Sequence, residues 1–259
     1  KAIEVMAGYD EHDATSANVP TEEYSKGLST DVKGLRIGIP EEYFGDGIDP
    51  DIREAIEGVK SKLQKAGCTL VPISMPHTKY SIAVYYILTT AEASSNLARF
   101  DGIRYGYRTP NAASLNDTYV KSRSEGFGTE VKRRIMLGTY VLSSGYYDAY
   151  YKRAQKVRRL VKSDFTSAFK KVDAILTPTT PTTAFKLGEK TTDPLSMYLN
   201  DIFTVSANIS GSPAASIPVG LDRNGLPIGA QIICNDFKES TVLSLAKEVI
   251  VDVLADLKL

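Results

Sequence analysis

A strand–helix–strand succession within residues 34–75 constrains the fold more than any other feature of this sequence. Gly34–Pro40 is a short apolar run bounded by glycine and proline, which is typical of a buried strand. A helix is predicted to begin at Asp49 and Pro50, because aspartate caps free N–H groups and proline fits the first helical position. The apolar residues that follow fall on one helical face: Ile52, Ile56, Val59 and Leu63. Thr69–Ile73 then reads as a second strand, so the segment predicts a βαβ unit within a parallel sheet.

The rest of the chain alternates between helical and strand-like segments. Residues 78–170 are mostly helical in pattern, although residues 102–128 contain enough turn signals to predict loops. The last third returns to strands and ends in an amphipathic helix, at Asp173–Pro178, Ala214–Val219, Ile228–Ile233 and Lys238–Leu259. This order predicts an α/β protein with a mixed, largely parallel sheet and helices on both faces.

Composition excludes several classes of protein. Lys+Arg and Asp+Glu are equal at 31 each, and a zero net charge argues against a dedicated nucleic-acid binder. It leaves room for a local basic patch or for a partner that holds RNA. Cys68 and Cys234 cannot form a disulfide framework and are interpreted as buried thiols of a cytoplasmic protein. No apolar run approaches the ~18 residues of a membrane span, so no membrane partner is expected.

The residues that usually carry chemistry give little on their own. His12 and His77 are the two histidines, and neither lies beside a triad pattern, so both are interpreted as surface residues. Neither metal-ligand spacing nor a glycine-rich phosphate loop occurs, so no metal site is predicted. Asp46, Asp49 and Asp51 are explained by turn and capping roles.

Several longer strings resemble the amidase signature family. Two of them match its late strand-and-loop segments: Ala174–Pro181 (AILTPTTP), and Gly211–Pro218 (GSPAASIP) followed by Gly225–Gln231 (GLPIGAQ). Four more resemble the A subunits of tRNA-dependent amidotransferases within that family: Gly8-Tyr9-Asp10 with Asp13 and Ser16, Gly34–Pro40, Arg133–Thr139, and Leu142–Tyr150. The match runs from about Gly8 to Leu245, whereas residues 250–259 match the family poorly.

The resemblance implies that residues 1–259 are the C-terminal portion of one amidase domain, with a partial amidase signature fold. The family uses a serine nucleophile, a bridging serine and a lysine base, in and before a Gly/Ser-rich stretch. No such stretch occurs here, so these three residues are expected upstream of Lys1 and no catalytic residue is expected in this chain. Ser94-Ser95 and Ser143-Ser144 are superficially similar, but their Tyr- and Ala-rich helical contexts argue against a nucleophile.

The part of the site that the resemblance does assign to this chain binds free glutamine. Arg134 matches the group that grips the α-carboxylate, and a guanidinium can do so with two parallel hydrogen bonds. Asp201 matches the partner of the α-ammonium group, and Tyr85 matches a residue lining the same pocket. The residues alone leave plainer alternatives open: Arg134 as a solvated helix arginine, Asp201 as a cap for a helix beginning at Ile202, and Tyr85 as a core residue.

The implied whole is a subunit that releases ammonia from glutamine to convert Glu-tRNA(Gln) to Gln-tRNA(Gln). The implied partners are glutamine, the B and C subunits, and tRNA held through a partner. ATP and Mg are expected at the partner, with no cofactor in this chain, which is expected to be inactive alone. Two alternatives stay open: another amidase-signature amide hydrolase, and a non-catalytic binding or scaffold fragment.

Overall fold

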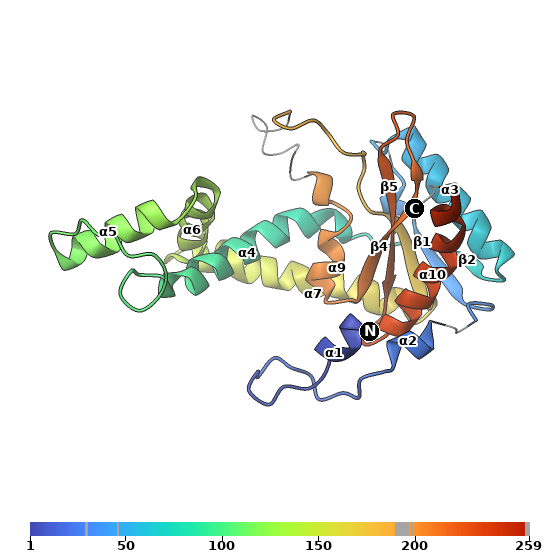
Figure 1. The fold of residues 1–259 in the computed structure, drawn as a ribbon, viewed down its shortest axis with the longest axis horizontal. Coiled ribbons are helices and arrows are strands. Elements are labelled where there is room, and N and C mark those ends of the chain that lie inside the picture. Colours follow the sequence, from blue (N-terminus) through green and yellow to red (C-terminus); the bar gives the residue numbers. More distant parts are fainter. Residues whose placement is uncertain (29–30, 46, 190–196, 198, 257–259) are drawn as a thin grey trace. The chain divides into compact units, whose positions relative to one another are not determined.

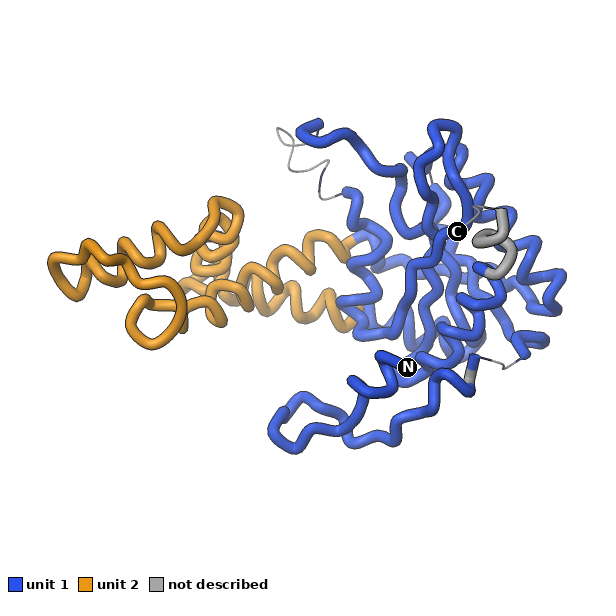
Figure 2. Tube along the Cα trace, in the orientation of Figure 1, with its two compact units in different colours: residues 1–79, 161–259 blue, residues 80–160 orange. Residues whose placement is uncertain are grey.

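The computed structural model describes residues 1–28, 31–45, 47–189, 197 and 199–256, with the backbone alone for 251–256. These residues form two compact units, which Figure 2 shows in two colours. Residues 1–79 and 161–259 form the first, called the sheet unit below, and residues 80–160 form the second, called the helical unit.

The sheet unit is built on a five-stranded mixed sheet with the order β2-β1-β3-β5-β4. The bounds are β1 (Arg36–Pro40), β2 (Thr69–Ile73), β3 (Ala174–Pro178), β4 (Ala214–Leu221) and β5 (Pro227–Cys234). β1 is parallel to both β2 and β3, whereas β5 is antiparallel to β3 and β4. The predicted mixed sheet is confirmed, and its parallel part is confined to β2-β1-β3. β4 and β5 pair antiparallel because only a short turn joins them.

One face of the sheet is covered by α3 (Pro50–Lys65) and α10 (Glu239–Asp256), which lie on the same side in Figure 1. α3 begins as predicted, because the Asp49 side chain accepts a hydrogen bond from the Asp51 backbone N–H at 2.9 Å. Its buried stripe is the predicted one, and it joins the core with residues of α10 and the strands: Ile52, Ile56, Val59, Leu63, Val242, Leu245, Ala174, Leu176 and Ile232. The βαβ succession over residues 34–75 is therefore present, with its helix packed on the sheet.

The other face carries α9 (Val205–Ser210), which Figure 1 shows on the opposite side of the sheet from α3 and α10. Along each strand, the side chains that point to this face alternate with those that point to the core beneath α3 and α10, as the pleat of a strand requires. Gln231 of β5 and Thr177 of β3 are directly opposite each other and both buried. The prediction of helices on both faces is confirmed.

The helical unit contains α4 (Ser81–Asn96), α5 (Leu115–Gly126), α6 (Thr129–Leu142), the π-helix η4 (Tyr147–Lys152) and the first half of α7 (Arg153–Ala168). α4 and α6 approach closely at Gly138, where a Cβ atom would lie 1.9 Å from the carbonyl oxygen of Thr90. The expectation of loops over residues 102–128 is wrong for α5. This helix is polar and lacks an apolar stripe, but Ser114 caps it by accepting a hydrogen bond from the Asp117 N–H at 3.1 Å.

The remaining elements are short: α1 (Ala2–Met6), α2 (Tyr24–Gly27), η1 (Glu41–Tyr43), η2 (Thr78–Tyr80), η3 (Leu97–Arg99) and η5 (Leu199–Asp201). η5 bears on function because it ends at Asp201, one of the predicted substrate-binding residues.

Candidate substrate-binding site

Arg134 projects from α6 in the helical unit, where its side chain is 34% exposed. Its Nε donates a hydrogen bond to Glu130 Oε1 at 3.0 Å, one helical turn earlier. Among the described residues no acceptor hydrogen-bonds the two Nη nitrogens. The guanidinium is therefore oriented through one edge, and the other edge, with its two N–H groups side by side, can receive a carboxylate.

Two tyrosines of α4 flank this arginine. The guanidinium carbon of Arg134 lies 5.9 Å from the centre of the Tyr86 ring, within the range of a cation–π contact. Tyr85 is half-buried and packs edge-on against Tyr86, with ring centres 5.1 Å apart. The hydrogen bond with Glu130 raises the pKa of Arg134, with smaller contributions from the phenols of Tyr85 and Tyr86, whereas burial opposes the shift. The arginine stays charged, as a carboxylate grip requires.

Sequence reasoning missed Glu130 and Tyr86. The signal for Glu130 was its place four residues before Arg134 on a predicted helix, which is the spacing of a helical ion pair. The signal for Tyr86 was weaker, because adjacent residues on a helix point in different directions and only packing decides which one faces a neighbour.

Asp201 lies at the end of η5 in the sheet unit and is exposed. Its backbone carbonyl accepts hydrogen bonds from the N–H and the hydroxyl of Thr204, both at 3.2 Å. Its carboxylate has no hydrogen-bond or ion-pair partner among the residues that the structure describes. The alternative that Asp201 caps a helix beginning at Ile202 is wrong, because α9 begins at Val205 with Thr204 in the capping position.

The predicted residues thus belong to different units. Arg134 and Tyr85 come together in the helical unit through α6 and α4, whereas Asp201 belongs to the sheet unit. The chemistry of the two parts is complementary, because a guanidinium edge suits a carboxylate and an exposed carboxylate suits an ammonium group.

One serine of each pair set aside in the sequence hydrogen-bonds a nearby backbone carbonyl, Ser94 within α4 and Ser143 directly after α6. Ser94 donates its hydroxyl hydrogen to the carbonyl of Ala91 at 3.0 Å, and Ser143 donates to the carbonyl of Tyr140 at 2.7 Å. A hydroxyl that donates its hydrogen to a backbone carbonyl is not donating it to a base that could activate it, so Ser94 and Ser143 have local backbone roles.

The histidines differ from each other. His12 is exposed, as expected of a surface residue, but His77 is only 36% exposed, and its ring Nδ1 lies 2.8 Å from Asp164 Oδ1. The Asp164 carboxylate also accepts the His77 backbone N–H at 2.8 Å. His77 is therefore a partly exposed residue whose ring and backbone are both held by Asp164. No group of three potential metal ligands was found among the described residues.

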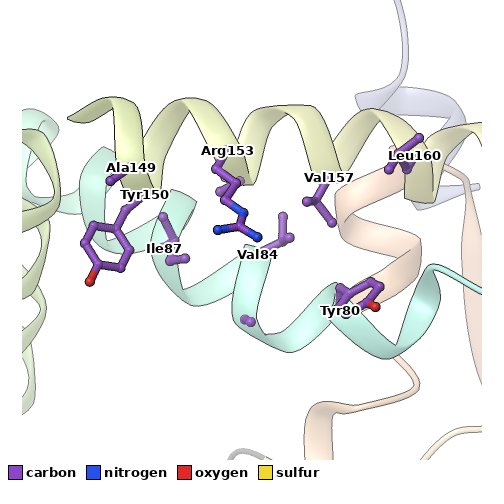
Figure 3. Close-up of a pocket in the computed structure, with 10 residues that line it drawn as sticks. Tyr80, Val84, Ile87, Ala149, Tyr150, Arg153, Val157 and Leu160 are labelled. Carbon is purple, nitrogen blue, oxygen red and sulfur yellow. The ribbon is translucent and has the colours of Figure 1, made fainter. Parts of the chain in front are cut away.

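A cavity of about 330 Å³ opens in the helical unit between α4 and the η4–α7 segment (Figure 3). Its lining is mostly apolar: Tyr80, Ala83, Val84, Ile87, Ala149, Tyr150, Arg153, Ala154, Val157 and Leu160. Arg134 and Tyr85 do not line it, so it is separate from the predicted glutamine pocket.

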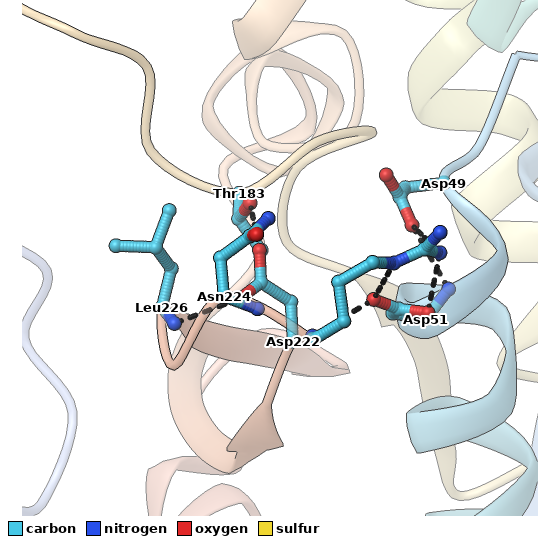
Figure 4. Close-up of polar contacts among 7 residues, drawn as sticks. Asp49, Asp51, Thr183, Asp222, Asn224 and Leu226 are labelled. Carbon is cyan, nitrogen blue, oxygen red and sulfur yellow. Dashed lines mark hydrogen bonds and ion pairs between the residues drawn. The ribbon is translucent and has the colours of Figure 1, made fainter.

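The aspartates near the start of α3 are structural. Asp49 caps the helix, and Asp51 forms two hydrogen bonds with the Arg223 guanidinium, from Nε at 2.7 Å and from Nη2 at 2.6 Å (Figure 4). The hydrogen bonds from Arg223 lower the pKa of Asp51. Asp46 lies outside the described residues. The ion pair ties the turn between β4 and β5 to the N-terminus of α3, which supports the fold and leaves Asp51 no substrate role.

Comparisons with known proteins agree with the resemblance of the sequence to the amidase signature family. The family model described as Amidase matches residues 1–243. The A subunit of glutamyl-tRNA(Gln) amidotransferase from Acidobacterium capsulatum is 58% identical over 249 residues, which are 96% of this chain and 52% of that protein. The protein of the same description from Brevibacillus brevis is 58% identical over 244 residues, 94% of this chain and 50% of that one. The chain therefore spans about half the length of the curated relatives it matches.

Solved structures give the same result for the fold. The crystal structure of the A subunit of glutamyl-tRNA(Gln) amidotransferase from Thermotoga maritima is 40% identical, with a TM-score of 0.69 over 92% of this chain and 47% of that one. A bacterial aryl acylamidase of the amidase signature family is 20% identical, with a TM-score of 0.73 over 96% of this chain and 49% of that one. The second likeness is one of fold alone. No described helix is both long enough and apolar enough to cross a membrane.

Proposed function

Since this chain belongs to the amidase family, we propose that it is the glutamine-binding part of the A subunit of a tRNA-dependent amidotransferase. The observation that carries the proposal is the state of Arg134. Its guanidinium is oriented by Glu130 and Tyr86, and two of its N–H groups on one edge have no acceptor among the described residues. A neutral amide offers such an edge only an uncharged carbonyl oxygen, whereas a free amino acid offers both oxygens of its charged α-carboxylate.

On this proposal each charge of glutamine has its own partner residue. Arg134 accepts the α-carboxylate, and Tyr85 lines the pocket beside it. Asp201, whose carboxylate has no partner among the described residues, accepts the α-ammonium group. Each charge of the substrate loses water on binding and needs an opposite charge to compensate.

The cleavage itself is assigned to a serine nucleophile, a bridging serine and a lysine in the part of the subunit preceding this chain. The serine oxygen bonds to the amide carbon of glutamine, and the C–N bond breaks. The hydroxyl proton of the nucleophile passes through the bridging serine to the neutral lysine as the new bond forms, and the same route returns it to the leaving nitrogen, so that ammonia departs. Water then hydrolyses the glutamyl ester to glutamate. On this proposal the isolated chain binds but does not hydrolyse glutamine.

Partners and cofactors follow from the same proposal. Ammonia passes to a partner subunit, where Glu-tRNA(Gln) activated by ATP is converted to Gln-tRNA(Gln) in the cytoplasm. ATP and Mg are assigned to that partner and no cofactor to this chain, and the B and C subunits are the expected binding partners. A partner surface is supported by the exposed large side chains of the helical unit, among them Met136, Leu137, Tyr140, Tyr146 and Tyr150.

Steady-state kinetics of glutamine hydrolysis in the assembled amidotransferase test the proposal. Arg134→Ala is expected to raise the KM for glutamine about 30-fold, the range for losing hydrogen bonds to a charged group. Arg133→Ala is the matched control, because Arg133 is on the same helix and pairs with the same Glu130, with its side chain 50% exposed. An unchanged KM in Arg134→Ala would reject the glutamine clamp and favour an amide hydrolase of another specificity. Capture of the B and C subunits without any turnover would favour the scaffold alternative.

A further inference from the structure

The position of the Asp201 carboxylate depends on the backbone that follows it. Asp201 ends a single turn of 3-10 helix, and its side chain has no partner among the described residues to hold it. Its carbonyl is tied to Thr204, which fixes Asp201 relative to residues 202–204. The nearest buried residue along the chain is Phe203, so anything that holds Phe203 also holds Asp201.

Phe203 is held by side chains from three other places in the sheet unit. Its ring stacks on that of Tyr43, with centres 5.4 Å apart. Its carbonyl oxygen accepts two hydrogen bonds, from Gln231 Nε2 at 3.1 Å and from Ser206 Oγ at 3.2 Å. Ser206 is in turn hydrogen-bonded to the Tyr43 hydroxyl at 2.5 Å. The carbonyl is thus fixed both within its own turn and to the sheet.

Gln231 provides the link to the sheet. It lies on β5, directly opposite Thr177 of β3, and is 4% exposed. Its Nε2 also donates to the Thr177 hydroxyl at 3.0 Å. The Phe203 carbonyl can only accept, so the amide must present its NH₂ group there, and one hydrogen reaches each partner. A buried amide satisfied in this way is rigid, and it transmits the position of the sheet to the Asp201 turn.

We propose that Gln231 is a positioning residue for glutamine binding, which holds Asp201 where it meets the α-ammonium group of the substrate. The inference rests on the proposed function, because it takes Asp201 as the ammonium partner. Gln231 itself touches no substrate. Its contribution is to fix the backbone that carries the exposed Asp201 carboxylate before the substrate arrives. Less conformational entropy is then lost when glutamine binds.

The test is the kinetics of Gln231→Leu in the assembled amidotransferase, with two substrates. Leucine keeps the volume and removes the two donors. The KM for glutamine is expected to rise about fivefold, the loss of one ordinary hydrogen bond, while kcat stays within about twofold. The second substrate is 4-carbamoylbutanoate, which is glutamine without the α-ammonium group. Its KM is expected to stay unchanged, because it makes no use of Asp201. An equal rise for both substrates would mean a general structural role and overturn the inference.

Three further variants separate the inference from the function on which it rests. Gln64→Leu is the matched control, since Gln64 is an exposed glutamine on α3. Asp201→Asn must itself raise the KM for glutamine, and if it does not, the proposed function fails rather than the inference. Gln231→Leu added to Asp201→Asn should have no further effect, because Gln231 acts through Asp201.

A further substitution keeps the inference testable if Gln231→Leu does not fold. Ser206→Ala removes the other donor to the Phe203 carbonyl, and the same split between the two substrates is then expected. If Asp201→Asn raises the KM for glutamine while Gln231→Leu and Ser206→Ala leave it unchanged, only the inference is overturned.

Discussion

The two units of this chain hold their proposed substrate-binding residues in opposite ways. In the helical unit, Arg134 is oriented by its own side-chain contacts, with Glu130 at 3.0 Å and the Tyr86 ring at 5.9 Å. In the sheet unit, Asp201 has no side-chain partner among the described residues, and its backbone is held through Phe203 instead. A long side chain with many rotamers benefits from contacts along its length. A short carboxylate has few rotamers, and fixing its backbone is enough.

The units also differ in charge. Residues 80–160 contain 13 lysines and arginines against six aspartates and glutamates, although the whole chain has 31 of each. The same residues include 11 of the 15 tyrosines. A zero net charge therefore hides a basic, tyrosine-rich helical unit and an acidic remainder. Zero net charge argues against a dedicated nucleic-acid binder only for the chain as a whole and not for each unit separately.

Thiol reactivity should show the largest contrast between the units. Burial raises the pKa of Cys234 in the sheet core to about 12. At pH 8 its thiolate fraction is then about a thousandfold below that of an exposed cysteine, and labelling should wait for unfolding. Leu137→Cys on the exposed face of the helical unit is the comparison, because Leu137 is half-exposed. A chromogenic disulfide should modify the introduced thiol within minutes, and equally fast labelling of Cys234 would contradict the buried core.

A cavity in the sheet core should cost the most stability. Leu176 is fully buried at the centre of β3 and belongs to the core shared with α3 and α10. Leu176→Ala is expected to lower the free energy of unfolding by about 3 kcal/mol. Urea denaturation followed by circular dichroism measures it. The exposed Leu137→Ala should change the value by less than about 0.5 kcal/mol, and a similar loss in both variants would remove the contrast between the units.

Two helical glycines should respond with opposite signs. Gly138→Ala places a Cβ 1.9 Å from the Thr90 carbonyl and must separate α4 from α6, at an expected cost of about 2 kcal/mol. It should also raise the KM for glutamine, because α6 carries Arg134 and α4 carries Tyr85. Gly58 of α3 has no atom near its Cβ position, so Gly58→Ala should stabilise by roughly 0.5–1 kcal/mol. Thermal melting of the two variants decides, and a stabilised Gly138→Ala would show that the helices do not approach as described.

The smallest effect is expected from an ion pair at the N-terminal ends of the neighbouring strands β1 and β3. Asp173 accepts two side-chain hydrogen bonds from Arg36, at 2.8 and 3.1 Å, and these lower the pKa of Asp173. A carboxyl with a depressed native pKa contributes stability above its unfolded pKa of about 4, and this is lost as the pH falls through the native value. Both side chains are partly exposed, so screening leaves about 0.5 kcal/mol.

Asp173→Asn measures that contribution. It should lower the free energy of unfolding at pH 7 and lower it by less at pH 3, because the stability contributed by the charged carboxyl is lost as the pH falls below its unfolded pKa toward the depressed native value. Parallel urea titrations at the two pH values give the comparison. A loss of the same size at both would mean that the carboxylate charge contributes nothing.

Much of the sheet unit could be predicted from local sequence, because its signals lie within a few residues of each other. The cap at Asp49 and the apolar stripe that begins at Ile52 define α3 without reference to the rest of the chain. α5 was not predicted, because its sequence carries a capping residue but lacks the apolar stripe that marks α3 as a helix. Sequence can identify a capping residue. It does not show which two helices approach closely at a glycine, as α6 does at Gly138 against α4.

The candidate site was predicted less completely. The resemblance gave Arg134, Asp201 and Tyr85, which are the residues assigned to direct contact with substrate. It included Gln231 only as the last residue of a matching string, without a role, and it did not include Tyr86. The roles of both residues come from packing between elements far apart in the sequence. Gln231 is 28 residues from the carbonyl it holds. No local periodicity encodes a hydrogen bond of that span.

The most direct test of the glutamine clamp compares Arg134→Ala and Asp201→Asn on glutamine and two analogues in the assembled amidotransferase. 4-Carbamoylbutanoate lacks the α-ammonium group, and 4-aminobutanamide lacks the α-carboxylate. Arg134→Ala should lower kcat/KM for glutamine and 4-carbamoylbutanoate at least tenfold and leave 4-aminobutanamide unchanged. Asp201→Asn should lower it for glutamine and 4-aminobutanamide and leave 4-carbamoylbutanoate unchanged. Equal losses on all three substrates, or none, would contradict the assignment of the α-carboxylate to Arg134 and of the α-ammonium group to Asp201.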